Sequence, residues 1–382
     1  MSSIDDFFDD DSFNVDEEPF YEESINPLKD SITNWIEENC DVRGTYKINN
    51  DNTIDVDGDI DVYTYEHSID KLPDYIKFKY VSGIFDVNPK GDLNDTFISL
   101  KGCPKEVGKS FLCMDCKKLE SLEGAPEKVG GDFDCSYCSS LESLEGVPKE
   151  VGGNFDCRGC FLLKDLEHAP EKVGGDFDCS YCSSLESLEG VPKEVGGDFD
   201  CRGCFSLKDL EHAPEKVGGN FNCSDCSHIE SLKGALEEIC GDFDCRGCFS
   251  LKGLKDAPKK VGGDFDCSYC SSLESLEGTP KEVGGNFDCS SCNSLKNLEH
   301  APKKVGGDFN CSNCYSLESL AGMPETLSGS FYCVNCTSLK TLESAPDEVA
   351  GNFDCSGCNS LKSLESAPKV KGNFTCLGRL VK

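Results

Sequence analysis

The sequence predicts an α/β repeat solenoid that is mostly β, a curved array with a parallel sheet on its concave face and 3₁₀ helices or turns on its convex face. Three observations lead to this fold class. The chain of 382 residues contains 28 cysteines, and 24 of them form twelve C-x-x-C pairs that recur every 22 residues from Cys113 to Cys355. A phenylalanine stands two residues before each pair, and most units contain a Gly-Gly turn and a proline. A fixed period of this length is the signature of a solenoid.

One unit, residues 133–154, reads FDCSYCSSLESLEGVPKEVGGN. Phe133 and Cys135 alternate with a polar residue, so F-x-C is predicted to be a short strand with one face inward. Gly152 and Gly153 turn the chain before the next strand, and Pro148 prevents a long helix on the outer side. Identical residues of neighbouring units are then expected to stack about 4.8 Å apart, the spacing of adjacent strands.

The unit resembles the leucine-rich repeat, whose frame is L-x-x-L-x-L-x-x-N/C-x-L. Phe133 and Cys135 match the strand positions, and Cys138 matches the N/C position. Leu141 and Leu144 match the downstream leucines, with one extra residue after the second cysteine. This Cys-bearing variant of 22 residues also looks like repeat proteins of large tailed phages and some bacteria. The resemblance implies a solenoid that binds a partner on its concave face.

Four regions are predicted along the chain. The first 25 residues contain ten acidic and no basic residues, which is typical of a disordered tail, although their five aromatic residues also fit a binding motif for a basic partner. A repeat array needs caps on its apolar ends. The predicted regions are an acidic disordered tail (1–26), an N-terminal cap with a helix, a hairpin and irregular repeats (27–110), twelve repeats (111–373) and a C-terminal cap (374–382).

The paired cysteines have three interpretations. In the repeat frame they point into the core, where a free cysteine behaves as a small hydrophobe. C-x-x-C pairs also supply thiolates for zinc or an iron–sulfur cluster, and neighbouring units are close enough for disulfides. We favour the core, because twelve equal pairs would require an extended ladder of metals. The ladder cysteines include Cys135, Cys138, Cys157, Cys160, Cys179, Cys182, Cys201 and Cys204.

The residues between the core positions are predicted to form the open concave face. Acidic residues dominate there, and alternate units give the middle of the array a period of 44 residues, for which duplication of a two-unit block is the simplest explanation. The aspartates either cap turns and prevent sheet association, bind calcium weakly or attract a basic partner. The candidate partner-binding residues are Asp134, Asp156, Asp178, Asp200, Asp244 and Asp266, with Arg158, Arg202, Arg246, Tyr137, Tyr181 and Tyr269.

Composition and motifs argue against several classes of function. A net charge of −34 argues against binding to nucleic acid or to anionic membranes. No nucleophile motif, phosphate loop or H-E-x-x-H motif is found, so we expect neither an enzyme nor a cofactor. The N-terminus has no secretory signal, which predicts a cytoplasmic protein, in the host cytoplasm if it is encoded by a phage. The sequence therefore favours a protein-interaction scaffold. A metal-binding or redox-responsive thiol ladder and an acidic decoy that mimics nucleic acid remain the alternatives.

Overall fold

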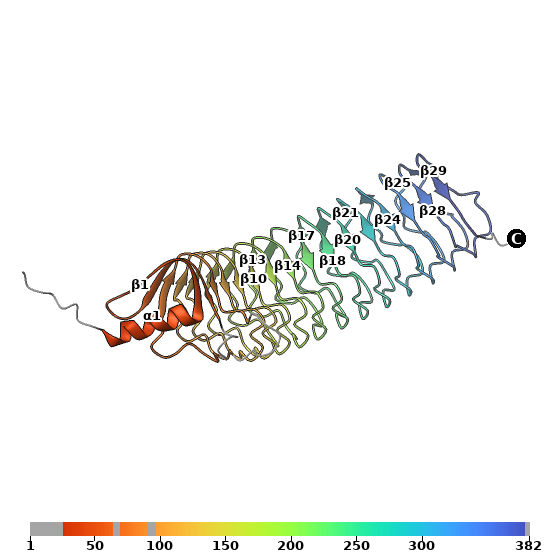
Figure 1. Ribbon diagram of the computed structural model, residues 1–382. Helices are drawn as coiled ribbons and strands as arrows, with labels where there is room; N and C mark the ends of the chain where they lie inside the picture. Colours follow the sequence, from red (N-terminus) through yellow and green to blue (C-terminus); the bar gives the residue numbers. More distant parts are fainter. Residues whose placement is uncertain (1–25, 64–68, 90–96, 379–382) are drawn as a thin grey trace, which may run out of the picture.

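The computed structural model describes residues 26–63, 69–89 and 97–378. The predicted acidic tail lies outside the described residues except for Asn26, as do residues 379–382 of the predicted C-terminal cap. The described chain forms a mostly-β parallel solenoid of about fourteen turns with a repeat of about 22 residues. Figure 1 shows an elongated stack with α1 and β1 at one end and β28 and β29 at the other. We call each turn of the solenoid a rung.

Most rungs contain a two-residue strand that begins with phenylalanine. These strands pair in parallel and in register, so that Phe155 lies between Phe133 and Phe177. Neighbouring ring centroids are 5.0–5.8 Å apart from Phe85 to Phe374. This is the Phe sheet, with strands β4 (Phe85–Asp86), β6 (Phe111–Leu112), β8 (Phe133–Asp134), β10 (Phe155–Asp156), β12 (Phe177–Asp178), β14 (Phe199–Asp200), β16 (Phe221–Asn222), β18 (Phe243–Asp244), β20 (Phe265–Asp266), β22 (Phe287–Asp288), β24 (Phe309–Asn310), β26 (Phe331–Tyr332), β28 (Phe353–Asp354) and β30 (Phe374–Thr375).

A second row of short parallel strands precedes the Gly-Gly turn. It forms three separate ladders, because β15 does not pair with β17 and β23 does not pair with β25. This is the Val sheet, with strands β3 (Phe78–Val81), β5 (Glu106–Val107), β7 (Lys128–Val129), β9 (Glu150–Val151), β11 (Lys172–Val173), β13 (Glu194–Val195), β15 (Lys216–Val217), β17 (Glu238–Ile239), β19 (Lys260–Val261), β21 (Glu282–Val283), β23 (Lys304–Val305), β25 (Thr326–Leu327), β27 (Glu348–Val349) and β29 (Lys369–Val370).

The Val sheet lies where the sequence predicted only 3₁₀ helices or extended turns. The described residues contain turns on this side but no 3₁₀ helix. A sheet forms because the extended residues after each proline pair with the preceding rung, as when the Gly152 N–H donates to the Val129 carbonyl at 3.1 Å. Two-residue strands show no alternation in the sequence, so this second sheet was not predicted.

The first residue of the Gly-Gly turn lies close to the backbone of the preceding rung. A Cβ built at Gly196 would lie 2.1 Å from the carbonyl oxygen of Gly174 in the preceding rung. Cys240 and Ser328 occupy the equivalent position in β17 and β25 rungs, where the sheet is interrupted. Ala350 has the smallest side chain and keeps its bond to the Leu327 carbonyl at 3.0 Å. Lys371 occupies this position in the last full rung, where β29 still pairs with β27, so a side chain here does not by itself interrupt the sheet.

Lysine and glutamate alternate along the Val sheet. The first strand residues alternate from Glu106 to Lys304, and opposite charges therefore lie one rung apart. The Lys172 Nζ lies 2.7 Å from the Glu150 carboxylate. Each exposed pair contributes little alone, but like charges in direct opposition would destabilise the stack. This complementarity gives the 44-residue period a structural reason.

The N-terminal end of the stack is covered by a helix and a long hairpin. Helix α1 (Pro27–Asn39) lies where the sequence predicted a helix, with proline in its first turn and Asn26 as its cap. Strands β1 (Cys40–Ile48) and β2 (Ile54–Val62) pair antiparallel. Strand β2 then pairs with β3 in its first half and with β4 in its second half. One strand therefore covers the first edge of both sheets.

The C-terminal end is more open in the described residues. Strand β30 pairs with β28, and the Phe374 ring stacks on Phe353. Phe374 is 40% exposed and Leu377 is 72% exposed. The described part of the predicted cap is therefore a last rung of the same architecture.

Helix α1 contains 13 residues, and no helix among the described residues combines the length and apolar character that a membrane crossing requires.

Candidate functional site

The outward side chains of the Phe sheet form a column of carboxylates. Their exposed fractions are 16–27% for the five that contact arginines. Each Oδ1 accepts a hydrogen bond from the backbone N–H two residues later, as Asp156 does from Arg158 at 3.0 Å and Asp200 from Arg202 at 2.9 Å. This Asx-type bond fixes the turn after each strand. We call this column the Asp face, and it comprises Asp134, Asp156, Asp178, Asp200, Asp244, Asp266 and Asp288.

Two rungs show that the capping bond does not require a charge. Asn222 and Asn310 occupy the same position as the aspartates. Their Oδ1 atoms accept the same backbone bonds, from Ser224 at 2.9 Å and Ser312 at 3.0 Å. Turn capping therefore explains an aspartate or asparagine in this column, but it does not explain the negative charge of the Asp face.

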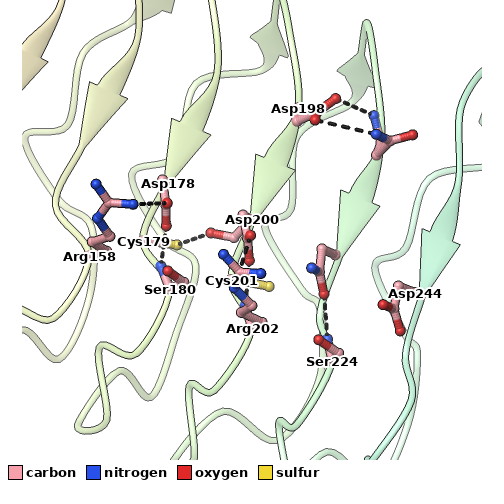
Figure 2. A network of polar contacts seen from close by, with 12 residues as sticks. Arg158, Asp178, Cys179, Ser180, Asp198, Asp200, Cys201, Arg202, Ser224 and Asp244 are labelled. Atoms are coloured by element: carbon pink, nitrogen blue, oxygen red, sulfur yellow. Dashed lines mark hydrogen bonds and ion pairs between the residues drawn. The ribbon is translucent and has the colours of Figure 1, made fainter.

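Three arginines partly neutralise the Asp face. Arg158 lies 3.0 Å from the Asp156 carboxylate and 3.8 Å from that of Asp178, its neighbour on the next rung. Arg202 contacts Asp200 at 3.3 Å, and Figure 2 shows both arginines beside the carboxylates. Arg246 repeats the arrangement with Asp244 at 3.1 Å and Asp266 at 3.9 Å. The structure therefore brings the predicted arginines and aspartates together on one surface.

The three arginines do not fully neutralise the carboxylates of the Asp face. Burial raises the pKa of Asp156 to about 7 and the pKa values of Asp200 and Asp244 to about 6. Burial also raises the pKa of Asp266. Neighbouring aspartates contribute to these shifts, while the arginine side chains and the capping bonds oppose them. Asp156, Asp200 and Asp244 therefore exchange protons near neutral pH.

The predicted tyrosines lie beside the arginines in a strained backbone conformation. Tyr137 and Tyr181 have φ angles of 58° and 59°, in the left-handed region that bulky residues rarely adopt. Gly159 occupies the equivalent position on the next rung, where an added Cβ would lie 2.6 Å from the Tyr137 ring. The Arg158 guanidinium lies 5.9 Å from the centroid of that ring, within the range of a cation–π contact. The rung after Tyr269 has serine instead of glycine at the equivalent position, and Tyr269 is more exposed than Tyr137 and Tyr181.

Exposed aromatic side chains continue along this edge of the Asp face. Phenylalanine follows the second cysteine in each arginine rung, while the residue before the second cysteine is tyrosine in three of the four rungs beside them and Asp225 in the fourth. Both sets of rings are exposed in the turns that follow the strands of the Phe sheet. We call this edge the aromatic rim, and its members are Tyr137 (41% exposed), Phe161 (43%), Tyr181 (44%), Phe205 (45%), Phe249 (50%) and Tyr269 (59%).

A second column of polar residues lies just before each phenylalanine and has a structural role. Each side chain accepts a hydrogen bond from the backbone of the next rung, as Asp198 does from the Asn220 N–H at 2.7 Å. The Asn220 amide also donates to Asp198 at 3.3 Å, which Figure 2 shows. This ladder links successive rungs and is not a candidate binding site.

The predicted cysteine ladder is buried in the core. In successive rungs the second cysteine donates its S–H to the carbonyl of the first cysteine in the preceding rung, as Cys160 does to Cys135 at 3.3 Å. Burial raises the pKa of the Cys113, Cys267 and Cys289 thiols well above the usual range. Among the described cysteines, all are free and only Cys240 is exposed. The raised pKa keeps Cys113, Cys267 and Cys289 protonated, whereas side-chain hydrogen bonds with Cys333 and Cys336 lower the pKa of Cys358, in the last cysteine pair, to about 4.

Replacing Cys204 with serine is expected to lower the free energy of unfolding by about 1–3 kcal/mol. The Cys204 side chain is 0% exposed and donates to the Cys179 carbonyl at 3.3 Å. The Cβ–Oγ bond of serine is shorter than the Cβ–Sγ bond of cysteine, so the hydroxyl reaches the carbonyl less well. Serine also buries a more polar group. Urea denaturation at pH 7 measures the change, and an unchanged midpoint would contradict the core role of this thiol.

The stability of the array is expected to fall as the pH rises from 5 to 8. The folded pKa values of Asp156, Asp200 and Asp244 exceed the unfolded value of about 3.9. The folded state therefore binds more protons than the unfolded state, and protonation stabilises it until the pH passes the folded pKa values. We expect a loss of roughly 2–4 kcal/mol, because one pKa unit corresponds to about 1.4 kcal/mol and coupled sites share their shifts.

Denaturation midpoints at pH 5 and pH 8 measure this dependence. The control is a variant with Asn at positions 156, 200 and 244, because Asn222 shows that asparagine fits the column. That variant is expected to lose most of the pH dependence. Equal midpoints at both pH values for the unchanged chain would contradict the raised pKa values.

Within residues 26–63, 69–89 and 97–378, no three side chains of His, Cys, Asp or Glu are grouped so that they could hold a metal ion. The Oδ1 atoms of the Asp face accept backbone bonds instead.

Comparison with known proteins gives a distant match. No protein-family model matches the chain, and no curated protein matches it. Among solved structures, the chain is similar to a leucine-rich repeat protein from Bacteroides ovatus ATCC 8483, with 15% sequence identity and a TM-score of 0.42 over 86% of this chain and 84% of that one.

Proposed function

We propose that the protein is a non-enzymatic scaffold that binds a basic segment of a protein partner across the Asp face and the aromatic rim. The observation that supports this proposal most strongly is the surplus charge of the Asp face. Asn222 and Asn310 make the capping bonds without a charge, yet the column keeps Asp156, Asp200 and Asp244 although burial raises the pKa of each. A cationic partner would recover the energy that this arrangement costs.

Charge complementarity defines the partner. Seven aspartates and three arginines leave a net charge of −4 on the fully ionised Asp face. Arginine side chains of a partner would pair with the outer carboxylate oxygens and displace the bound protons. Opposite charges arranged in this way steer encounter and select against acidic partners.

The aromatic rim supplies the apolar part of the surface. Its rings are between 41% and 59% exposed, although aromatic side chains of this size are usually buried in a core. Exposed rings beside carboxylates attract cations through their faces, and aromatic residues dominate the energetics of protein interfaces.

The test is the binding of an arginine-rich peptide of about ten residues to three versions of the full chain. A triple variant, Asp134→Asn, Asp178→Asn and Asp288→Asn, removes three charges from the Asp face and keeps the turn caps. It is expected to bind the peptide at least ten-fold more weakly at roughly physiological salt. The control, with Glu127, Glu171 and Glu215 changed to Gln, removes the same charge from the Val sheet side and is expected to change affinity less than three-fold.

A second variant tests the aromatic rim. Phe161, Phe205 and Phe249 are changed to serine, which the intervening units carry at the same position, so the fold is expected to tolerate the changes. We expect a further five-fold or greater loss of affinity. If this variant binds the peptide as tightly as the unchanged chain, the binding site consists of the carboxylates of the Asp face and excludes the aromatic rim.

The same experiment separates the alternatives. An acidic decoy binds through its overall charge, so the Asp-face variant and the control would weaken binding equally, and salt would abolish it. That result would contradict the proposal. A thiol ladder for metal or redox chemistry requires thiolates, and burial raises the pKa values of the Cys113, Cys267 and Cys289 thiols. Geometry and charge therefore favour the scaffold.

A further inference from the structure

The surface formed by the Asp face and the aromatic rim repeats every two rungs. Arginine follows the first cysteine in the rungs of β10, β14 and β18, and we call the rungs of β8, β12, β16 and β20 the intervening rungs. Neighbouring strands are about 4.8 Å apart, so equivalent side chains recur about every 9.6 Å along this surface. A chain that binds along the surface makes the same contacts at every repeat only if its own structure has a similar spacing.

The carboxylates of the intervening rungs are the more weakly paired ones. Asp178 lies 3.8 Å from Arg158, and Asp266 lies 3.9 Å from the arginine of the preceding rung. The aspartates of the arginine rungs lie closer to their own arginines, at 3.0–3.3 Å. The β16 rung has Asn222 in the column, but Asp225 replaces its tyrosine and supplies a carboxylate. Carboxylates that can accept a further cation therefore recur every two rungs.

Tyrosine rings lie beside these carboxylates. The Tyr137 ring lies over the glycine of the next rung, and Tyr181 repeats this arrangement. The guanidinium of that next rung lies 5.9 Å from the centroid of the Tyr137 ring and 5.8 Å from that of Tyr181, so both rings adjoin the Asp face. Among the described residues, the hydroxyl groups of these two tyrosines make no hydrogen bond. Each ring is therefore held in place while its donor stays available to a ligand.

The polyproline II helix is the regular peptide conformation that fits this spacing. It has three residues per turn and rises about 3.1 Å per residue, so residues i and i+3 lie on one side about 9.3 Å apart. Side chains of a β-strand alternate between two faces, so those on one face are about 6.6 Å or about 13 Å apart. An α-helix returns to the same side after seven residues, or about 10.5 Å.

The difference grows along the array. Six strand spacings separate the rungs of Tyr137 and Tyr269, or about 29 Å. Nine residues of polyproline II cover about 28 Å, whereas three heptads of an α-helix cover about 31 Å. The polyproline II helix therefore stays in register with all four intervening rungs more closely than an α-helix does.

We propose that the partner segment binds as a polyproline II helix that carries a basic residue at every third position. Its basic side chains pair with the carboxylates of the intervening rungs, and prolines between them pack against the aromatic rim, as proline-rich segments do in aromatic-lined grooves. Its backbone carbonyls have no internal hydrogen bonds, so they accept from the hydroxyls of Tyr137 and Tyr181. This inference rests on the function proposed for the Asp face and adds the conformation and the spacing of the partner.

The test compares synthetic peptides of one composition in their binding to the full chain, measured by fluorescence anisotropy. Each peptide has about thirteen residues, with four arginines among prolines and alanines, and the arginines stand two, three or four residues apart. Because the charge is constant, a difference in affinity reports the spacing. We expect the peptide with arginine at every third residue to bind at least five-fold more tightly than the other two at roughly physiological salt.

Two further peptides test the conformation. Replacing the prolines of the best peptide with glycine removes the pre-formed polyproline II helix and is expected to weaken binding at least three-fold. An alanine-rich peptide with arginines seven residues apart presents the same charge on one side of an α-helix. If it binds as tightly as the peptide with arginine at every third residue, the proposed conformation is wrong.

A double variant of the chain, Tyr137→Asn and Tyr181→Asn, tests the role of the tyrosines. Asparagine fits this backbone, because Asn313 and Asn335 occupy the same position with φ angles of 61° and 60°. We expect the preference for the three-residue spacing to fall below two-fold.

The matched control is Tyr315→Asn. This ring is 51% exposed but lies beyond the intervening rungs, and Asn293 and Asn359 occupy the equivalent position in other rungs. The control is expected to keep the full preference for the three-residue spacing. An equal loss in the two variants would contradict the role of Tyr137 and Tyr181.

The experiment separates this inference from the proposed function. If all spacings bind equally while Asp134→Asn, Asp178→Asn and Asp288→Asn together still weaken binding, the inference is overturned and the scaffold function stands. If no peptide binds the unchanged chain, both are overturned.

Discussion

Replacing Phe199 with alanine is expected to lower the free energy of unfolding by about 3–5 kcal/mol, the range for removing a buried aromatic ring. The Phe199 side chain is 0% exposed, and its ring centroid lies 5.6 Å from Phe177 and 5.1 Å from Phe221. The neighbouring rungs have identical packing and cannot move into the cavity without breaking their own stacks. Because each rung contacts only its neighbours, the cavity also weakens the coupling between the two halves of the array.

Urea denaturation followed by circular dichroism measures both effects, as a lower midpoint and a broader or divided transition. The matched control is Phe205→Ala, six residues away, whose ring is 45% exposed on the aromatic rim and outside the Phe ladder. It is expected to change stability by less than about 1 kcal/mol. Equal losses in the two variants would contradict the assignment of the Phe ladder as the core.

Replacing Arg158, Arg202 and Arg246 together with serine is expected to destabilise the array strongly at pH 8 and weakly at pH 5. Each arginine contacts a half-buried carboxylate at 3.0–3.3 Å. A hydrogen bond to a charged group contributes about 1.5–3 kcal/mol, so three such losses amount to roughly 4–9 kcal/mol if they are independent. Lowering the pH protonates the aspartates, whose pKa values are about 6–7, and removes most of the penalty.

Serine is the appropriate replacement because Ser136, Ser180 and Ser224 occupy this position in the intervening rungs. The experiment compares denaturation midpoints at the two pH values for both chains. As a control for charge alone, Lys164, Lys208 and Lys252 lie exposed at a different position of the same rungs and are changed to glutamine. A loss that is the same at pH 5 and pH 8 would show that the arginines act through packing rather than through the carboxylates.

The core of the fold follows directly from the sequence. A 22-residue period places the same residue type at the same point of every rung. Because Phe133, Cys135 and Cys138 are buried in one rung, their equivalents are expected to be buried in the other rungs as well. The Val sheet does not follow, because a strand of two residues gives no hydrophobic alternation. Its pairing depends on the close approach of backbones at Gly152 and its equivalents, which only the three-dimensional stack shows.

The candidate site was only partly predictable. The sequence placed the aspartates, arginines and tyrosines on one outward face, because strand residues alternate. It could not show that Asp156 is a turn cap with a raised pKa, since both depend on the half-burial created by the neighbouring rungs. Nor could it show that Tyr137 adopts a positive φ angle, which the turn geometry imposes. The alternation of Lys and Glu is explained only by the stack, which places opposite charges one rung apart.

Asp156 and Asp200 are expected to hold protons near neutral pH and to release them when a cationic segment binds the Asp face. The most direct measurement is a carboxyl carbon-13 NMR titration of Asp156 and Asp200, assigned with single Asn variants, in the free chain and with the arginine-rich peptide. We predict pKa values of about 7 and about 6 in the free chain, and a fall of at least one unit in the presence of the peptide, because binding and proton release are reciprocally linked. Ordinary aspartate pKa values in the free chain, or raised values that the peptide leaves unchanged, would contradict the account.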